Sequence, residues 1–277
     1  MIVFPNAKIN IGLNIVRDRA DGYHDLETIF YPIPVSESLE CVVSPENEDV
    51  DFLCLGLSVA GDAQSNLVVK AVNLLKKEGY KIPGLKVILD KRIPMGAGIG
   101  GGSADATFML MMLNEKFNLE ISKEELIRMA AKLGADCPFF VLNSPVYATG
   151  IGEVMTPIDL NLGGLHFVLV RPNVFVSTKQ AFSGIVSKPS IHSLPEVVKY
   201  PISEWHKYIH NDFEDSIFPS FPEIKRVKDI LVENGALYAS MSGSGSSVYG
   251  IFDKCPDSHL SEKFADSYYF HTILPNV

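Results

Sequence analysis

A run of glycines in the first half of the chain constrains its fold more than any other feature. Five glycines occupy seven consecutive positions between Gly96 and Gly102, and the small residues Ser103 and Ala104 follow directly. Glycine has no β-carbon, so successive backbone N–H groups can converge on one point. A helix that begins near Ser103 would add its unpaired N–H groups and the positive end of its dipole. The run is therefore predicted to hold an anion such as phosphate.

The flanks of the glycine run indicate which kind of phosphate loop it forms. Gly96, Gly98 and Gly101 match the G-x-G-x-x-G pattern of dinucleotide-binding folds. That pattern normally follows a short strand that opens the fold. Here about 80 residues precede the strand, and Pro94 stands between the strand and the loop. The P-loop pattern G-x-x-x-x-G-K-[ST] does not occur in the sequence. We therefore expect a third kind of glycine loop, one that holds a triphosphate.

Composition and charge limit the class of protein. The 277 residues are 47% hydrophobic, which is enough for one large domain or two modest ones. A net charge of -9 and an isoelectric point near 5.3 argue against a nucleic-acid or membrane-surface binder. The four cysteines lack C-x-x-C spacing, and the N-terminus carries no secretory signal pattern. We expect a cytoplasmic protein with reduced thiols, no nucleic-acid partner and no membrane partner.

Hydrophobic periodicity and turn residues predict an α+β protein of two domains. Strands are expected at residues 8–16, 28–35, 38–43, 85–90, 166–170, 238–241 and 247–252. Helices are expected at residues 67–78, 104–116, 177–186 and 223–233, with another that begins at a capping box of Ser122 and Glu125 and stops at Gly134. A polar connector around residues 155–165 favours a first domain at 1–155 and a second at 156–277.

Two segments carry charged residues suited to catalysis. On a strand, Lys8 and Asn10 share one face, so a cation and an amide would project together into a cleft. An exposed strand edge with polar side chains toward solvent is the alternative. Asp136 is a lone carboxylate among small and apolar residues after a helix. A buried acid is costly unless it is paired, so Asp136 is a candidate partner for a lysine such as Lys8, or else a cap of the next turn.

A second turn rich in glycine and serine lies late in the chain, at residues 239–247. Such a turn can approach a ligand closely, although a flexible hairpin is the commoner outcome. Here it occurs in one chain with the glycine run, the strand that carries Lys8 and the carboxylate of Asp136. The combination predicts a site that moves a phosphoryl group.

Three segments resemble the three motifs of the GHMP kinases: Pro-x-Ala-Lys-x-Asn at residues 5–10, the glycine run at 94–106, and Met-Ser-Gly-Ser-Gly-Ser at 241–246. Within this superfamily, residues 19–28 and 133–140 resemble the branch that phosphorylates a cytidyl-bearing alcohol in non-mevalonate isoprenoid synthesis. The resemblance runs from Pro5 to about Phe252. It implies an N-terminal domain like ribosomal protein S5 domain 2, a ferredoxin-like C-terminal domain, and ATP in the cleft between them.

The same resemblance implies roles for individual residues. Asp136 would be the base that takes the proton of the substrate hydroxyl, and Lys8 would ease that transfer and hold the pair in register. The glycine loop would wrap the triphosphate of ATP, with two polar residues nearby. The nucleotide-binding residues implied are Asn66, Lys91, Pro94, Met95, Gly96, Ala97, Gly98, Ile99, Gly100, Gly101, Gly102, Ser103 and Ala104.

The resemblance also implies a small-molecule cytidyl substrate. Aromatic faces stack on any base, whereas a histidine ring can read the donor–acceptor edge that separates cytosine from uracil. Tyr23 and Phe182 are therefore expected to sandwich the base, with His24 as the reader; core packing is the alternative for Phe30 and Phe182. The substrate-binding residues implied are Asn10, Tyr23, His24, Phe30, Thr178, Phe182 and Gly245.

The sequence assigns no metal ligands. Mg²⁺ is expected with ATP because the charge of the triphosphate must be screened, and Ser103 could contact it. His206 and His210 stand four residues apart and could ligate a metal, but no third ligand follows at a suggestive spacing. For these two histidines a solvated helix is the favoured interpretation.

Two other functions stay open at this point. Another GHMP kinase, of the homoserine or mevalonate type, would lack the Asp-Gly-Tyr-His segment at residues 21–24 and the Gly-Ala-Asp-Cys-Pro segment at 134–138. A catalytically silent nucleotide-binding regulator is disfavoured by the presence of Lys8 and Asp136. We expect an ATP-dependent small-molecule kinase that is a monomer or a weak homodimer.

Overall fold

The computed structural model of the chain describes residues 1–45, 49–58 and 61–277. Its contacts divide the chain into two compact units, each assembled from several segments. Unit 1 comprises Met1–Ala7, Val35–Met95 and Gly100–Asn143, and unit 2 comprises Lys8–Pro34, Gly96–Ile99 and Ser144–Val277. The domain boundary at residue 155 stays a prediction.

Unit 1 contains a four-stranded sheet of β1 (Ile2–Val3), β4 (Ser38–Val43), β6 (Leu85–Lys91) and β5 (Val50–Gly56), in that spatial order. The first three strands pair antiparallel, whereas β5 runs parallel to β6. Adjacent parallel strands need a crossover between them, and here the crossover carries the 3-10 helix η1 (Ala63–Ser65) and the helix α1 (Leu67–Lys77). The expected strands at 38–43 and 85–90 are confirmed.

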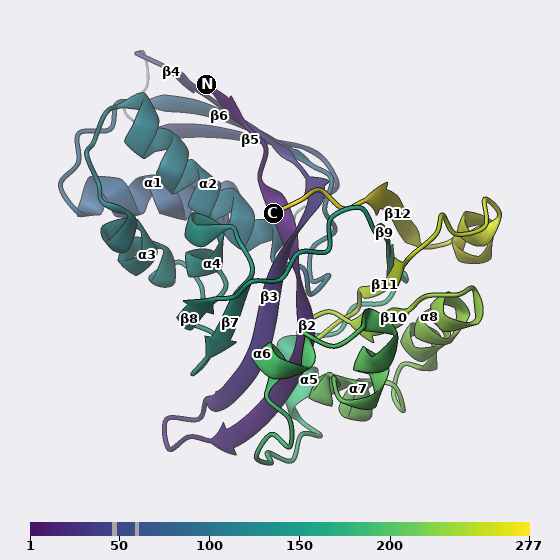
Figure 1. The fold of residues 1–277 in the computed structure, drawn as a ribbon. Helices are drawn as coiled ribbons and strands as arrows, with labels where there is room; N and C mark the ends of the chain where they lie inside the picture. Colours follow the sequence, from purple (N-terminus) through teal and green to yellow (C-terminus); the bar gives the residue numbers. More distant parts are fainter. Residues whose placement is uncertain (46–48, 59–60) are drawn as a thin grey trace. The chain divides into compact units, whose positions relative to one another are not determined.

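Helices pack on this sheet and build the core of unit 1. α1 and α2 (Gly101–Lys116) lie side by side against one face of it (Figure 1), accompanied by α3 (Lys123–Ala131) and α4 (Cys137–Leu142). The buried face of α1 packs with apolar side chains of β4, β6 and α2 in one cluster. Burial of such an amphipathic face is the main stabilising term for helices of this length.

Local capping explains where these helices begin. The Asn66 side chain accepts a hydrogen bond from the backbone N–H of Val68, so α1 starts where the sequence predicts. α2 starts at Gly101, three residues before the expected position 104. Gly100 adopts a left-handed conformation with φ of 74°, which turns the chain directly into the helix. Ser122 caps α3 by accepting the N–H of Glu125, which is one of the two bonds of the expected capping box, and α3 ends at Ala131, before the expected stop at Gly134.

The first sheet of unit 2 is formed by β2 (Asn6–Asp18), β3 (His24–Ser36), β7 (Val146–Thr149) and β8 (Val154–Pro157), in that order. A tight turn joins β2 to β3, where the N–H of Arg19 donates to the carbonyl of Tyr23 at 2.9 Å. Most side chains of β2 are buried on both faces, so a polar residue on it must find partners inside the protein.

The second sheet of unit 2 is β10 (Tyr238–Met241), β11 (Val248–Phe252), β9 (His166–Arg171) and β12 (Tyr268–Ile273), in that order and antiparallel throughout. In chain order this is 2-3-1-4, the ferredoxin-like arrangement that the sequence analysis expects. The connections carry α5 (Thr178–Phe182), α6 (Leu194–Val197), η2 (Ile202–Lys207), α7 (Asp212–Ile217), α8 (Pro222–Glu233) and η3 (Leu260–Phe264). α8 packs on β10 and β11 over an apolar core (Figure 1).

Three expectations for unit 2 are wrong in detail. The helix expected at 177–186 is the five-residue α5, which ends at Phe182 just before Gly184, a poor helix former. His206 and His210 do not share a helix, because the 3-10 helix η2 ends at Lys207. Residues 187–201, where neither a helix nor a strand is expected, include the short helix α6. No helix within the described residues is long and apolar enough to cross a membrane.

Candidate active site

Lys8 lies on β2 with only 3% of its surface exposed. Its Nζ donates a hydrogen bond to Oδ1 of Asn10 at 2.7 Å and lies 4.6 Å from the centroid of the Phe30 ring. These contacts compensate the cost of burying an ammonium group. Lys8 and Asn10 therefore share one face of the strand as predicted, and the alternative of a solvent-exposed edge is wrong.

Hydrogen bonds fix both the side chain and the backbone of Asn10. Its Nδ2 donates to Oγ1 of Thr28 at 3.0 Å, and that hydroxyl donates to the carbonyl of Gly12 at 2.5 Å. Its backbone carbonyl accepts the hydroxyl of Tyr249 at 2.9 Å. Because each polar atom of a buried network is paired, the position of the Asn10 amide, and with it Lys8, is fixed.

The part of the glycine run that belongs to unit 2 is hydrogen-bonded to both other motifs. The N–H of Lys8 donates to the carbonyl of Ile99 at 3.0 Å, which joins the run to β2. The hydroxyl of Ser242 donates to the carbonyl of Gly98 at 2.9 Å, and the N–H of Ser247 donates to the carbonyl of Ala97 at 3.2 Å. The three motifs that resemble those of GHMP kinases thus meet within one unit.

Gly98 shows why this junction requires glycine. Its φ is 74°, in the left-handed region. A β-carbon there would collide with the carbonyl oxygen of Ser242 and lie 2.9 Å from that of Gly245. The backbones of the second and third motifs can therefore approach closely only without a side chain at position 98.

Asn211 holds the turn of the third motif from another side. Its Nδ2 donates to the carbonyls of Met241 at 2.8 Å and Gly243 at 2.9 Å, while its Oδ1 caps α7 by accepting the N–H of Phe213. The N–H of Gly245, one of the predicted substrate contacts, donates to the carbonyl of Ser242 at 3.0 Å. The segment is the turn of the hairpin that β10 forms with β11, and these hydrogen bonds hold it.

A cavity of about 120 Å³ in unit 1 gathers several of the predicted nucleotide-binding residues. Asn66, Lys91, Met95 and Gly102 line it, together with Ser65, Leu67, Leu89 and Asp105. The cavity lies at the start of α2, where the helix N-terminus favours a negatively charged ligand.

Lys91 stands between two buried carboxylates. Its Nζ donates to Oε1 of Glu37 at 2.5 Å and to Oδ2 of Asp105 at 2.8 Å. Burial opposes charge on Lys91, but the two carboxylates outweigh it and raise its pKa. For Asp105 burial is the larger effect: it raises the pKa of this carboxyl to about 7, although the charge of Lys91 acts to lower it. One ammonium thus faces two acids in a site with little solvent.

The sequence does not predict Asp105 or Glu37 as site residues. Asp105 Oδ1 is buried and has no hydrogen-bond partner among the described residues, although Asp105 lines the cavity. Glu37 also accepts the N–H of Arg92 at 2.9 Å, which fixes the strand end before the glycine run. An acid inside an otherwise apolar helix is the signal that could have singled out Asp105.

Asp136 lies in unit 1 at the N-cap position of α4. Its side chain makes no capping hydrogen bond to that helix, so the interpretation of Asp136 as a cap is not supported. The hydroxyl of Thr107 on α2 donates to the carbonyl of the next residue, Cys137, at 2.9 Å. This bond anchors the segment that carries the carboxylate. The pairing of Asp136 with Lys8, which belongs to unit 2, stays a prediction.

His24 and Phe182 form an aromatic pair in unit 2. Their rings stack with centroids 4.6 Å apart and an angle of 11° between their planes. His24 Nδ1 lies 2.8 Å from Oδ1 of Asp18, and Phe182 also packs edge-on against Phe213. Asp18, which sequence reasoning missed, thus orients the imidazole.

The other predicted substrate contacts lie in different surroundings. Tyr23 is 60% exposed at the turn before His24. Thr178 is the first residue of α5, where Ser177 and Gln180 form a capping box. Phe30 is buried beneath Lys8, six residues along β3 from His24. At a strand rise of about 3.4 Å per residue that is roughly 20 Å, so a single base does not span both.

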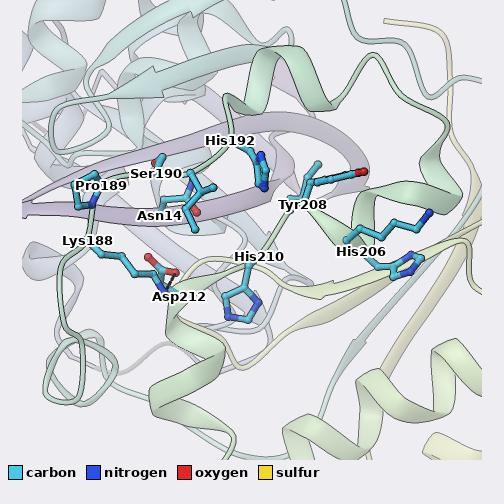
Figure 2. A pocket seen from close by; sticks show the side chains of 12 residues that line it. Asn14, Lys188, Pro189, Ser190, His192, His206, Tyr208, His210 and Asp212 are labelled. Carbon is cyan, nitrogen blue, oxygen red and sulfur yellow. Dashed lines mark ion pairs between the residues drawn. The ribbon is translucent and has the colours of Figure 1, made fainter.

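A further cavity of about 340 Å³ in unit 2 is lined by none of the predicted site residues. Figure 2 shows His192 and Tyr208 on one side of it and the ion pair of Lys188 with Asp212 on the other. Asp212 Oδ2 also accepts the N–H of Ile15 at 2.7 Å. Two other polar residues of the lining have partners outside it, since Ser190 donates to Glu27 and His210 lies 3.1 Å from Asp215. The sequence predicts no role for this cavity.

Family models match both halves of the chain. One described as the GHMP kinases N terminal domain matches residues 66–144, and one described as GHMP kinases C terminal matches residues 194–269. The first includes the glycine run and Asp136, and the second includes the turn around Ser242. These matches and the α+β architecture define the class of protein as a two-domain small-molecule kinase.

Curated relatives resemble the chain along nearly its whole length. A 4-diphosphocytidyl-2-C-methyl-D-erythritol kinase of Bacteroides fragilis is 50% identical over 276 residues, 99% of this chain and 100% of its own. That of Parabacteroides distasonis is 51% identical over 270 residues, 97% of each chain. A crystal structure of 4-(cytidine 5'-diphospho)-2C-methyl-D-erythritol kinase is similar with a TM-score of 0.81 and 29% identity, covering 99% of both chains. The chain belongs to the GHMP kinases, in the family of 4-diphosphocytidyl-2-C-methyl-D-erythritol kinases.

Proposed function

We propose that the chain transfers the γ-phosphoryl group of ATP to the 2-hydroxyl of 4-diphosphocytidyl-2-C-methyl-D-erythritol, in non-mevalonate isoprenoid precursor synthesis. The observation that carries the proposal is the full-length similarity to curated kinases named for that substrate, at about 50% identity. The hydrogen bonds that join the three motifs in unit 2 support it. Phosphoryl transfer requires positioning and charge stabilisation rather than a covalent intermediate. The junction would supply the positioning, and the buried ammonium group of Lys8 would supply positive charge.

For the chemical step we assign Asp136 as the general base and Lys8 as the cation beside the reacting hydroxyl. The substrate oxygen attacks the γ-phosphorus, its proton passes to the Asp136 carboxylate, and ADP leaves. Lys8 is suited to this role because Asn10 and Phe30 hold its ammonium group in a buried position. We propose that Phe30 supports Lys8 rather than the distant base.

ATP is assigned to the glycine run and the adjoining cavity of unit 1. The backbone N–H groups of residues 95–103 would bind the triphosphate, and the cavity lined by Asn66 and Lys91 would take a further part of the nucleotide. Mg²⁺ prefers oxygen ligands, which fits the Ser103 hydroxyl in the first turn of α2. When bound, it would neutralise charge on the phosphates.

Recognition of the cytidine base is assigned to the aromatic pair of unit 2. If His24 Nδ1–H donates to the Asp18 carboxylate, Nε2 presents a lone pair. Cytosine offers an amino donor where uracil offers a carbonyl acceptor, so this lone pair selects cytosine. The base would stack on Phe182, with the exposed ring of Tyr23 and with Thr178 nearby.

We also propose that the enzyme is cytoplasmic and acts as a monomer or weak homodimer. All four cysteines are free, and Cys41 and Cys137 are buried. Free thiols of this kind fit a reducing compartment.

An assay of ATP consumption tests the proposed function. The purified protein is offered the cytidyl compound, homoserine and mevalonate in parallel, with Asp136→Asn as the background control. We expect turnover with the cytidyl compound alone. Comparable turnover of homoserine or mevalonate would assign the chain to another kinase of the family, and failure with all three would favour a silent nucleotide binder.

A further inference from the structure

Two histidines and a cysteine that none of these roles uses converge in unit 2. One ring nitrogen of His166, one of His271 and the Sγ of Cys255 all lie within 4.8 Å of one another. Nδ1 of His166 and Nε2 of His271 are 3.2 Å apart, and the two rings stack at 5.4 Å. Three donor atoms of two kinds therefore face one small volume.

The register of the second sheet of unit 2 produces this convergence. β9 pairs with β12 so that His166 is opposite Ile273 and Val168 is opposite His271. Residues two apart on a strand share a face, so the two histidines are diagonal neighbours on one face. On the other side of β9, His166 is opposite Phe252, and the chain leaves β11 there to reach Cys255. Strand pairing on both sides of β9 thus brings the three side chains together.

We propose that His166, Cys255 and His271 bind a zinc ion. Imidazole nitrogen and thiolate sulfur are the donors that Zn²⁺ prefers. In a tetrahedral site with ordinary Zn–N and Zn–S bonds, the ligand atoms are separated by about 3.3–3.6 Å. The observed 3.2 Å between the nitrogens and the limit of 4.8 Å for all three atoms are close to that geometry, so small side-chain rotations complete it.

Proton balance is simple for this site. The thiol of Cys255 releases its proton to solvent as the thiolate binds, and the N–H shared between the two rings moves to an outer ring nitrogen. Three ligands leave a fourth position for water. The ion would tie β12 to β9 and to the segment after β11, so it would stabilise the C-terminal strand.

A second cluster in the same unit provides a comparison. His210, Asp212 and Asp215 also place ligand atoms within 4.8 Å of one another. However, Asp212 already accepts the N–H of Ile15 and pairs with Lys188, and Asp215 pairs with His210. This cluster has no sulfur donor, so a cobalt spectrum distinguishes it from the first.

The experiment titrates the metal-free, reduced full-length protein with Zn²⁺ against a chromophoric chelator, and separately with Co²⁺. We expect one Zn²⁺ per chain and a thiolate-to-cobalt charge-transfer band. Cys255→Ser should abolish that band, and His271→Ala should weaken Zn²⁺ binding by about tenfold or more. The matched controls His259→Ala, another exposed histidine, and Asp215→Asn should change neither.

Melting curves complete the test, because an ion that binds only the folded protein raises the melting temperature. Zn²⁺ should raise the melting temperature of the wild type and both controls, and should raise that of His271→Ala by less at the same Zn²⁺ concentration. Without metal, all variants should melt like the wild type, since Cys255 and His271 are exposed. Equal Zn²⁺ affinity in wild type and His271→Ala, or no binding at stoichiometric Zn²⁺, would overturn the proposal. Neither result depends on kinase activity.

Discussion

The hydroxyl of Ser242 donates a hydrogen bond to the carbonyl oxygen of Gly98, 2.9 Å away. Its oxygen also accepts the backbone N–H of Asn10 at 3.2 Å. One side chain of the third motif therefore fixes the backbones of the other two. Asn10 in turn accepts the hydrogen bond from Lys8, so the glycine run and the proposed catalytic lysine are coupled through a single serine.

Gly98→Ala is expected to disrupt this junction. The new β-carbon would meet the carbonyl of Ser242, and φ of 74° is unfavourable for alanine. Together we expect a loss of about 2–4 kcal/mol in the free energy of unfolding, measured with denaturant, and weaker ATP binding.

Gly102→Ala is the matched control for that substitution. Its β-carbon would meet only Leu67, at 3.8 Å, and it lies within α2, where alanine is the better helix former. We expect its stability to stay within about 1 kcal/mol of the wild type. A Gly98→Ala protein as stable as Gly102→Ala would refute the close approach to Ser242.

Asp136→Asn should lower kcat by about a hundredfold or more, because a general base contributes at least that much. Lys8→Met keeps the buried volume without the charge and should also lower kcat. The Kd for ATP, measured by calorimetry, should change little in both. Asp229→Asn, an exposed acid paired with Lys225 on α8, should retain wild-type kcat. Full turnover by Asp136→Asn would place the base elsewhere.

Phe182→Ala should raise the KM for the cytidyl substrate without affecting that for ATP. Stacking on a base contributes about 1–3 kcal/mol, which corresponds to roughly a five- to hundredfold change. Tyr23→Phe keeps the aromatic face and serves as the control with an unchanged KM. If Phe182→Ala instead raised the KM for ATP, the base would not lie on this ring.

His24→Ala should act on selectivity. We expect a smaller preference for the cytidine compound over its uridine analogue, since the lone pair that penalises the uracil carbonyl is lost. Asp18→Asn should cause a weaker change in the same direction, because the Asp18 carboxylate orients the imidazole. The ratio of kcat/KM for the two compounds measures both. An unchanged ratio in His24→Ala would contradict its role as the reader.

The stability of unit 1 should depend on pH through Asp105. Burial raises the pKa of Asp105 to about 7 from 3.8, so the folded protein binds more protons than the unfolded chain between those values. The free energy of unfolding therefore falls as pH rises across that window and levels off above it. Asp105→Asn removes this term and keeps the pair of Lys91 with Glu37.

The free energy of unfolding of Asp105→Asn, relative to that of the wild type, should accordingly increase by about 1–3 kcal/mol between pH 4 and 7. This range is set below the full value of about 1.4 kcal/mol per pKa unit. Urea unfolding at several pH values measures it. Glu78→Gln is a control of opposite sign, because Lys132 lowers the pKa of Glu78. Parallel pH profiles for Asp105→Asn and wild type would show that Asp105 is ionised in both states.

Local signals predicted the local features well. Side-chain spacing and turn residues alone predict the cap at Asn66 and the strand that presents Lys8 beside Asn10. They also predict the first and last residues of β4 and β10. The ferredoxin-like strand order follows from the family resemblance, since strand pairing between distant segments has no local signature.

Contacts between distant segments account for what the sequence did not predict. Glu37 and Lys91 are 54 residues apart, and nothing near either residue indicates the other. The trio of His166, Cys255 and His271 depends on the register of three strands. The sequence predicts the start of α2 three residues too late, because glycines normally disfavour helices. In the structure, Gly100 adopts a left-handed conformation directly before the helix begins at Gly101.

Identification of the phosphorylated atom tests the central claim most directly. The protein is incubated with ATP, Mg²⁺ and 4-diphosphocytidyl-2-C-methyl-D-erythritol, and the product is examined by phosphorus and proton nuclear magnetic resonance. The account predicts one new phosphomonoester on the 2-hydroxyl, formed together with one ADP per product and not formed by Asp136→Asn. A phosphate on another hydroxyl, or ADP released without any phosphorylated cytidyl compound, would contradict it.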